Sequence, residues 1–159
     1  MIFSRRTFIG SASAGAATLL AGCGSEAKAQ SFPVKLSDAE WRRRLSPSTY
    51  AVLRKGSTER AGTSPLDKEK RRGTFHCAGC GQALYRSDTK FESGTGWPSF
   101  WAPIRGAVGS KADNTLFMRR TEIHCSRCGG HLGHVFGDGP KPTGKRYCMN
   151  GAALAFRPA

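Results

Sequence analysis

The sequence has few acidic residues, no long hydrophobic run, no low-complexity segment and no internal repeat beyond two Cys-x-x-Cys pairs. Against 25 Lys and Arg it carries 11 Asp and Glu, which gives a formal net charge of +14. Such a charge is compatible with nucleic acid, an anionic membrane surface or an acidic partner. The basic residues are spread along the chain, however, and form no mixed basic and aromatic platform, so a solvated basic surface is favoured.

The longest apolar stretch covers residues 9–21 and is too short and too weakly apolar for a stable membrane span. It follows a twin-arginine pattern at Arg5 and Arg6. This order of features resembles a Tat export signal, whose cargo crosses the membrane already folded. We therefore expect residues 1–30 to be a leader and tether, and residues 31–159 to be one folded domain.

Two cleavage sites are possible in this leader. Residues 20–23 resemble a lipobox, in which Cys23 would be acylated and would anchor the protein to the outer face of a membrane. Residues 27–29 resemble an ordinary A-x-A site, and cleavage there would remove Cys23. In both cases we expect an extracytoplasmic protein, either periplasmic or membrane-anchored.

The abundance of glycine argues against an all-helical domain. The 20 Gly and 8 Pro indicate many turns, and a hydrophobic content of 38% suffices for one small core. Two short helices are predicted over 37–45 and 46–56, because Ser37 and Ser46 are good N-caps and Gly56 ends the second. Short strands are predicted at 73–77, 83–86, 114–125 and 146–156. The predicted fold class is mainly β (α+β).

Four of the six cysteines form two pairs, separated by 44 residues along the chain. The pairs are Cys77/Cys80 and Cys125/Cys128. Each turn directs both sulfurs at one point, and four thiolates complete the tetrahedron that Zn²⁺ accepts. With every position taken by sulfur, the metal would be structural. Two disulfides are the alternative in an oxidising compartment.

Cys148 lies outside these pairs, in the run RYCMNGAALAF over residues 146–156, which alternates like a strand. It is a candidate nucleophile, although a lone cysteine can also be a buried apolar filler. Arg146 and Asn150 are each two residues away, so one continuous strand would place them on the same face as Cys148. The cation of Arg146 would lower the pKa of the thiol there.

Two further stretches are too specific to be generic. They are FESGTGWPSF at 91–100 and HLGHVFGDGP at 131–140. Together with the cysteine pairs, they make the chain similar to the peptide-methionine (R)-S-oxide reductase (MsrB) family over about residues 37–157. The resemblance implies two packed antiparallel sheets with short N-terminal helices outside, one structural zinc ion, and reduction of methionine-(R)-sulfoxide, free or in oxidised proteins.

The resemblance also implies roles for particular residues. Cys148 matches the nucleophile that attacks the sulfoxide sulfur, releases methionine and becomes a sulfenic acid. His134 and Asn150 match the residues that bind and polarise the sulfoxide oxygen, and His134 is the natural proton donor. Trp97 matches the indole that receives the substrate's methyl group. His131 is expected to line the same pocket, with a packing role as the alternative. Arg146 is also expected to bind the substrate.

Two departures from the family stand out. Many members have a resolving cysteine in the loop where this chain has Thr95, so the sulfenic acid on Cys148 would need a thiol from a thioredoxin-like protein or a small molecule. Residues 116–118, Leu-Phe-Met, replace a more polar stretch, which puts a pocket-lining contact there in doubt.

Two other classes of function compete with this interpretation. The cysteine pairs and basic charge would also suit a zinc-ribbon module that binds nucleic acid, but export argues against it and no nucleic-acid partner is expected. A structural, metal-stabilised lipoprotein is the second alternative. It would leave His134, Cys148 and Asn150 without a purpose.

Overall fold

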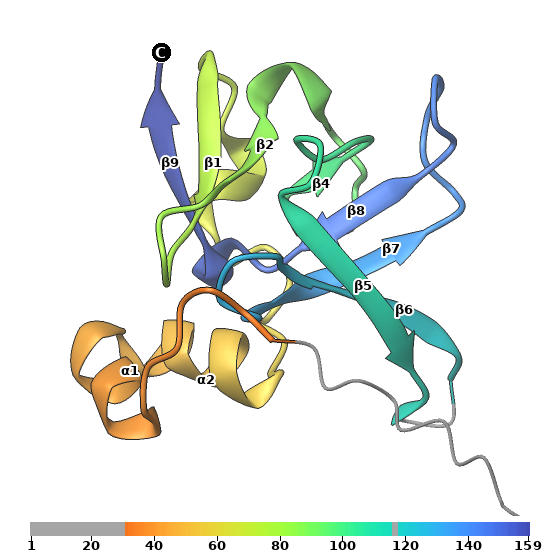
Figure 1. Ribbon diagram of the computed structural model, residues 1–159. Helices are drawn as coiled ribbons and strands as arrows, with labels where there is room; N and C mark the ends of the chain where they lie inside the picture. Colours follow the sequence, from red (N-terminus) through yellow and green to blue (C-terminus); the bar gives the residue numbers. More distant parts are fainter. Residues whose placement is uncertain (1–30, 116–117) are drawn as a thin grey trace, which may run out of the picture. The chain divides into compact units, whose positions relative to one another are not determined.

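The computed structural model describes residues 31–115 and 118–159, which form one compact unit. The predicted leader with Cys23, and Leu116 and Phe117 of the departure at 116–118, lie outside the described residues. Met118 is described, and its side chain is 52% exposed. The order along the chain is two α-helices, then strands joined by tight turns and short 3-10 helices (Figure 1).

Both predicted helices are present with the predicted caps. Helix α1 spans Asp38–Arg44, and Ser37 and Glu40 form a reciprocal capping box at its start. Helix α2 spans Pro47–Lys55, with Ser46 as N-cap and Gly56 in the left-handed conformation as C-cap. The helices of the described residues are all too short or too polar to span a lipid bilayer.

A three-stranded sheet contains the start and the end of the β-rich region. Its order is β2-β1-β9, with both pairs antiparallel. The bounds are β1 Gly73–Cys77, β2 Ala83–Arg86 and β9 Leu154–Pro158. Strands β1 and β2 coincide with the predictions for 73–77 and 83–86.

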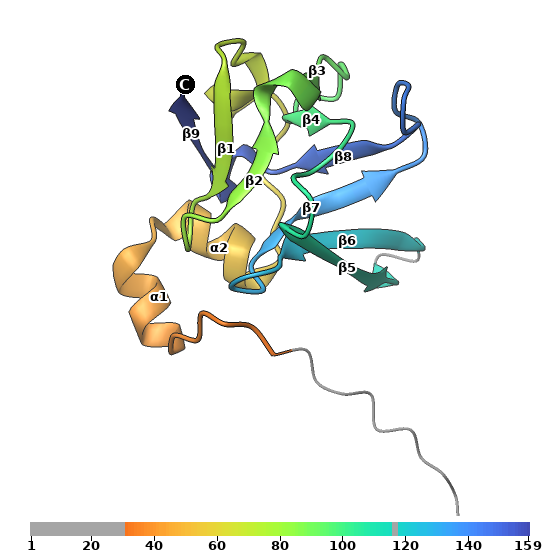
Figure 2. The same ribbon diagram turned by 45° about the horizontal axis from the view of Figure 1, so that its top comes forward.

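The second sheet has six strands in the order β3-β4-β8-β7-β6-β5, all antiparallel. Their bounds are β3 Lys90–Phe91, β4 Ser99–Phe100, β5 Val108–Asp113, β6 Arg120–Cys125, β7 His131–Phe136 and β8 Arg146–Met149. The connections contain three short 3-10 helices, which are η1 Pro65–Lys68, η2 Ser87–Thr89 and η4 Gly151–Ala153. Figures 1 and 2 show α1 and α2 together at one end of the two sheets.

Aromatic side chains join the two sheets. The ring of Tyr85 on β2 stacks on that of Phe100 on β4 with centroids 4.3 Å apart, and Phe75 on β1 meets Phe100 edge-on at 4.9 Å. The Tyr85 hydroxyl donates to Met149 Sδ on β8 at 3.2 Å. Burying each such ring contributes about 1.5–3 kcal/mol. This packing confirms the predicted fold class of two packed antiparallel sheets with short N-terminal helices.

Two predicted strands were wrong in extent. The strand predicted over 114–125 begins only at Arg120, because Asp113 Oδ1 accepts hydrogen bonds from the backbone and hydroxyl of Thr115 and ends β5 in a turn. The run 146–156 is two strands of different sheets, β8 and β9, separated by η4. Asn150 is therefore outside β8, and the strand alternation that placed it on the face of Cys148 does not apply.

Candidate active site

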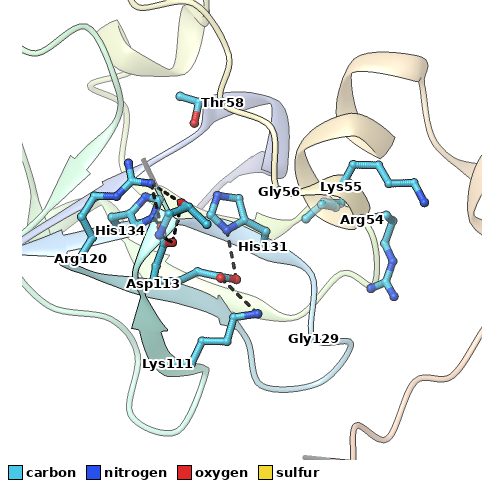
Figure 3. A pocket seen from close by; sticks show the side chains of 13 residues that line it. Arg54, Lys55, Gly56, Thr58, Lys111, Asp113, Arg120, Gly129, His131 and His134 are labelled. Carbon is cyan, nitrogen blue, oxygen red and sulfur yellow. Dashed lines mark hydrogen bonds and ion pairs between the residues drawn. The ribbon is translucent and has the colours of Figure 1, made fainter. Parts of the chain in front are cut away.

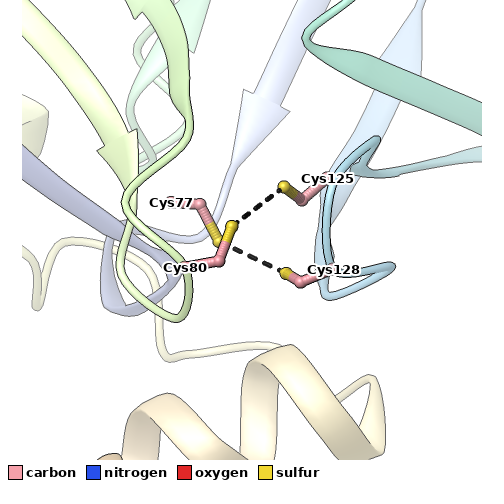
Figure 4. Close-up of side chains that lie close together, drawn as sticks. All are labelled: Cys77, Cys80, Cys125 and Cys128. Atoms are coloured by element: carbon pink, nitrogen blue, oxygen red, sulfur yellow. Dashed lines mark hydrogen bonds between the residues drawn. The ribbon is translucent and has the colours of Figure 1, made fainter. Parts of the chain in front are cut away.

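The four paired cysteines come together where β1 and β6 end, beside the helical region (Figure 4). Their sulfur atoms all lie within 4.8 Å of one another. Cys77 Sγ is 3.7 Å from Cys128 Sγ, and Cys80 Sγ is 3.5 Å from Cys125 Sγ. A tetrahedron with Zn–S bonds of about 2.3 Å has sulfur–sulfur edges of about 3.8 Å. The cluster therefore fits a metal ion with four thiolate ligands.

The four thiols of the cluster shift one another's pKa in opposite directions. Hydrogen bonds from neighbouring thiols, Cys128 foremost, lower the pKa of Cys125 to about 7, and those from Cys125 foremost lower the pKa of Cys80. The hydrogen bond with Cys125 instead raises the pKa of both Cys77 and Cys128. Without a cation, four such close sulfurs cannot all ionise. The five cysteines of the described residues are free, so disulfides within this cluster are excluded in the structure.

Helix α2 covers the cluster through close contacts at two glycines. A Cβ on Gly79 would lie 3.1 Å from Leu53 Cδ1, and one on Gly130 would lie 3.0 Å from Leu53 Cδ2. Arg54 donates from its guanidinium to the carbonyl of Cys128 at 3.1 Å. The cysteine cluster thus joins one strand of each sheet to the helical region, which is the arrangement of a structural site.

Cys148 lies in the six-stranded sheet, between two polar neighbours. In the strand register it pairs with Ser99 on β4 and with His134 on β7. Residues directly opposite in antiparallel strands project from the same face, so these three side chains form a row. The hydrogen-bonding pattern of the sheet, rather than proximity in sequence, brings them together.

Hydroxyl groups surround the thiol of Cys148. Thr95 Oγ1 is 3.9 Å from its Sγ, and Ser93 Oγ lies 2.8 Å from the hydroxyls of both Thr95 and Ser99. Burial raises the pKa of the Cys148 thiol above that of an ordinary cysteine, against the opposing effects of the Thr95 hydrogen bond and the charge of Arg146. The resting group is consequently the thiol rather than the thiolate at neutral pH.

His134 is paired with a carboxylate that the sequence did not reveal. Its Nε2 is 2.7 Å from Asp113 Oδ2, and Arg120 donates to the same oxygen at 2.8 Å (Figure 3). Burial lowers the pKa of His134, and Asp113 only partly offsets this. Hydrogen bonds from Thr115, followed by that from His134, hold the pKa of Asp113 well below its usual range. Since the carboxylate only accepts, neutral His134 carries its proton on Nε2 and a lone pair on Nδ1.

A cavity of about 130 Å³ opens beside Cys148. Its lining residues are Thr58, Trp97, Arg120, Gly133, His134, Phe136, Cys148, Met149 and Asn150. The volume suits one side chain rather than a longer ligand. The cavity therefore contains four of the predicted residues, namely the thiol, the imidazole, the amide and the indole.

Asn150 is held by hydrogen bonds on both ends of its amide. Its Oδ1 accepts from the backbone N–H of Glu59 at 3.0 Å, and its Nδ2 donates to the carbonyl of Leu132 at 3.1 Å. The side chain is buried, and one N–H of the amide has no partner among these bonds. Asn150 lines the cavity, so that N–H remains available as a donor to a ligand there.

Two predicted site residues do not line this cavity. His131 lines an adjoining pocket of about 570 Å³, where its Nδ1 is 3.2 Å from Glu122 Oε1 (Figure 3). Arg146 forms two hydrogen bonds with Asp138 and stacks over the ring of Phe136. The charge of its guanidinium lowers the pKa of Cys148, while its hydrogen bonds go to Asp138.

The comparisons with known proteins agree with this geometry. A model of the SelR domain matches residues 45–158. A protein of Leptospira interrogans named peptide methionine sulfoxide reductase MsrB is 53% identical over 127 residues, which is 79% of this chain and 97% of that protein. Proteins of the same name are 52% identical in Agrobacterium fabrum, over 79% of this chain and 93% of theirs, and 54% identical in Methanosarcina barkeri, over 78% and 88%. With its cysteine cluster, its cavity at Cys148 and this similarity, the chain belongs to the SelR-domain family of MsrB methionine sulfoxide reductases.

Proposed function

We propose that the protein is an enzyme that reduces methionine-(R)-sulfoxide, free or in oxidised proteins, with Cys148 as nucleophile. The observation that carries this proposal is the cavity in which Cys148, His134, Asn150 and Trp97 meet. Its small volume fits a methionine sulfoxide side chain. The indole of Trp97 offers a π face to the polarised S-methyl group, and the free N–H of Asn150 is a donor for the sulfoxide oxygen.

The reaction needs one net proton transfer. The thiol of Cys148 and the sulfoxide become a sulfenic acid and methionine, so that the oxygen moves from the substrate sulfur to Cys148 Sγ. Neutral His134 accepts the thiol proton, and the resulting imidazolium, which is held by Asp113, delivers that proton to the oxygen. Because the pKa of Cys148 is raised, the free enzyme holds the thiol, and this proton transfer produces the thiolate that attacks.

Regeneration of Cys148 requires a thiol from outside the described domain. Thr95 stands where many family members have a resolving cysteine and cannot form a disulfide, and the other four described cysteines make up the metal cluster. Two external thiol groups would convert the sulfenic acid back to the thiol, with release of water and formation of their own disulfide. A thioredoxin-like protein or a small thiol fits this role.

Zinc is the metal that best suits the cluster. Four thiolates in a tetrahedron are a typical structural zinc set, and the arrangement leaves no position for substrate. Bound zinc would neutralise the thiolates and hold the ends of β1 and β6 together. The residues at Cys148 carry out the chemistry without it.

Export is a separate part of the proposal. It is supported by the twin-arginine pattern, the short apolar stretch and the two alternative processing sites at residues 20–23 and 27–29. A protein in that location would repair oxidised proteins outside the cytoplasm, periplasmic or anchored through Cys23. Mass spectrometry of the mature N-terminus separates lipidation at Cys23 from cleavage after Ala29.

An assay with the two separated epimers of methionine sulfoxide tests the activity. Purified protein with a thiol reductant should consume the R epimer and leave the S epimer, because the two epimers require differently shaped pockets. Cys148→Ser is the matched control and should be inactive while it keeps its metal content. Equal consumption of both epimers, or activity in Cys148→Ser, would contradict the proposal.

A further inference from the structure

Glu59 lies in the connection between α2 and β1. Its backbone N–H donates to Asn150 Oδ1 at 3.0 Å, and its carbonyl accepts from Trp97 Nε1 at 3.2 Å. Its carboxylate accepts from the backbone N–H of Gly151 through Oε1 and from that of Ala152 at 2.8 Å through Oε2. One residue therefore holds four partners from two distant segments.

These partners are arranged around the cavity at Cys148. Trp97 and Asn150 line it, and Gly151 and Ala152 follow Asn150 directly in η4. The two carboxylate bonds fix the position of the Glu59 backbone against η4. The N–H and carbonyl of that backbone then fix the amide of Asn150 and the indole of Trp97. The carboxylate acts on the cavity through these bonds and does not line it.

The surrounding loop is packed closely against the same two segments. Gly62 N donates to the carbonyl of Gly96 at 2.7 Å, next to Trp97. A Cβ on Gly96 would lie 2.8 Å from Gly62 N, and one on Gly151 would lie 1.9 Å from Ser64 Oγ. These contacts leave no room for a side chain at either glycine. The loop is thus in place to transmit the position of Glu59 to the cavity.

We propose that Glu59 is a positioning residue that orients Trp97 and Asn150 for methionine sulfoxide. This inference rests on the proposed function and adds a residue to it that has no contact with the reacting atoms. A hydrogen bond to a charged group is stronger than one between neutral groups, so the carboxylate is the part of Glu59 that a substitution should test.

The first test compares Glu59→Ala with the unchanged protein and with Glu69→Ala. Glu69 lies in the same connection but pairs with Arg71, away from the cavity. Glu59→Ala should lower kcat/KM for the R epimer by about 10- to 100-fold, because small displacements of positioning groups have effects of this size. The loss should fall mainly on KM, since Trp97 and Asn150 contact the substrate. Glu69→Ala should stay within about twofold.

A spectroscopic measurement separates positioning from a general loss of structure. The chain has 3 Trp, and the indole N–H signal of Trp97 is the one that disappears in Trp97→Phe. In Glu59→Ala this signal should shift or broaden while those of Trp41 and Trp101 stay in place. The alkylation rate of Cys148 should remain within about twofold of the original rate, because Glu59 makes no bond to that side of the cavity.

Glu59→Gln keeps the test decisive if Glu59→Ala does not fold. Its amide oxygen can accept from one of the two backbone N–H groups, but its NH₂ faces the other without accepting. An intermediate rise in KM with a displaced Trp97 signal supports the proposal. A folded Glu59→Gln or Glu59→Ala with unchanged KM and an unmoved Trp97 signal overturns it. If the unchanged protein itself had no activity, the proposed function would be contradicted instead. The indole signal would still show whether Glu59 positions Trp97.

Discussion

The two sulfur sites of this protein differ in what surrounds the sulfur. In the cysteine cluster, four sulfurs lie within 4.8 Å of one another and serve as each other's neighbours. At Cys148 the neighbours are the hydroxyl of Thr95, Ser99 on β4 and His134 on β7. The cluster needs only two tight turns brought together. The Cys148 site needs side chains from several strands and loops.

This difference separates stability from chemistry. A closed set of four thiolates has no open position, so its contribution is to hold the fold. The thiol of Cys148 is single, half-buried and beside a cavity, and it is the group that we propose as the nucleophile. Substitutions in the cysteine cluster should therefore lower stability, whereas substitutions at the Cys148 site should lower activity.

The largest effect is expected at the cluster. Cys125→Ser removes one of four ligands, and structural zinc supplies on the order of 10 kcal/mol of folding free energy, comparable to the whole stability of a domain. We expect loss of metal and of the cooperative thermal transition. Circular dichroism with elemental analysis measures both. Zinc-free Cys125→Ser with an unchanged Tm would show that the cluster is not structural.

Removal of the imidazole should spare the fold and impair the chemistry. His134→Ala is expected to lower kcat by about 10²–10⁴-fold, the usual contribution of a general acid–base group. Asp113→Asn should lose less, because its side-chain oxygen still accepts the Nε2–H but no longer stabilises the imidazolium. His131→Ala should also lose less, since His131 lies outside the cavity. A loss below tenfold in His134→Ala would reduce His134 to a binding role.

The next prediction concerns a single turnover without reductant. One equivalent of substrate should leave a sulfenic acid on Cys148, which dimedone labels, and no internal disulfide. Thr95→Cys should instead yield a protein lighter by about two mass units, because the side chain at 95 is already 3.9 Å from Cys148 Sγ. An internal disulfide in the unchanged protein would refute the need for an external thiol.

The smallest effect is a pH shift at the thiol. Burial raises the pKa of Cys148 above that of an ordinary cysteine, so its alkylation rate by iodoacetamide should reach half-maximum at a higher pH than that of a solvent-exposed cysteine. The Thr95 hydroxyl stabilises the thiolate and lowers that pKa. Thr95→Val should therefore move the midpoint to higher pH and slow alkylation at pH 8. A midpoint below that of a solvent-exposed cysteine in the unchanged protein, or a downward shift in Thr95→Val, would contradict this account.

The local features of the fold were predictable from short stretches of sequence. Ser37, Ser46 and Gly56 delimit both helices, because caps satisfy backbone groups within one turn. The two Cys-x-x-Cys turns indicated the cluster for a similar reason, since each turn by itself directs two sulfurs to one point. The extent of β8 was not predictable, because the run 146–156 reads as one continuous strand. It ends at Met149 because backbone N–H groups of η4 bond to Glu59, about 90 residues earlier in the chain.

The sequence by itself determined the helix caps, the two metal-binding turns, Cys148 as the unpaired thiol and the motifs that indicate the family. Only the tertiary structure decided that Asp113 pairs with His134, that Thr95 borders the thiol and that Glu59 holds Trp97 and Asn150. The first group depends on bonds within a few residues. The second depends on strand register and loop packing between distant segments, and no local pattern distinguishes Asp113 or Glu59 from the other acidic residues.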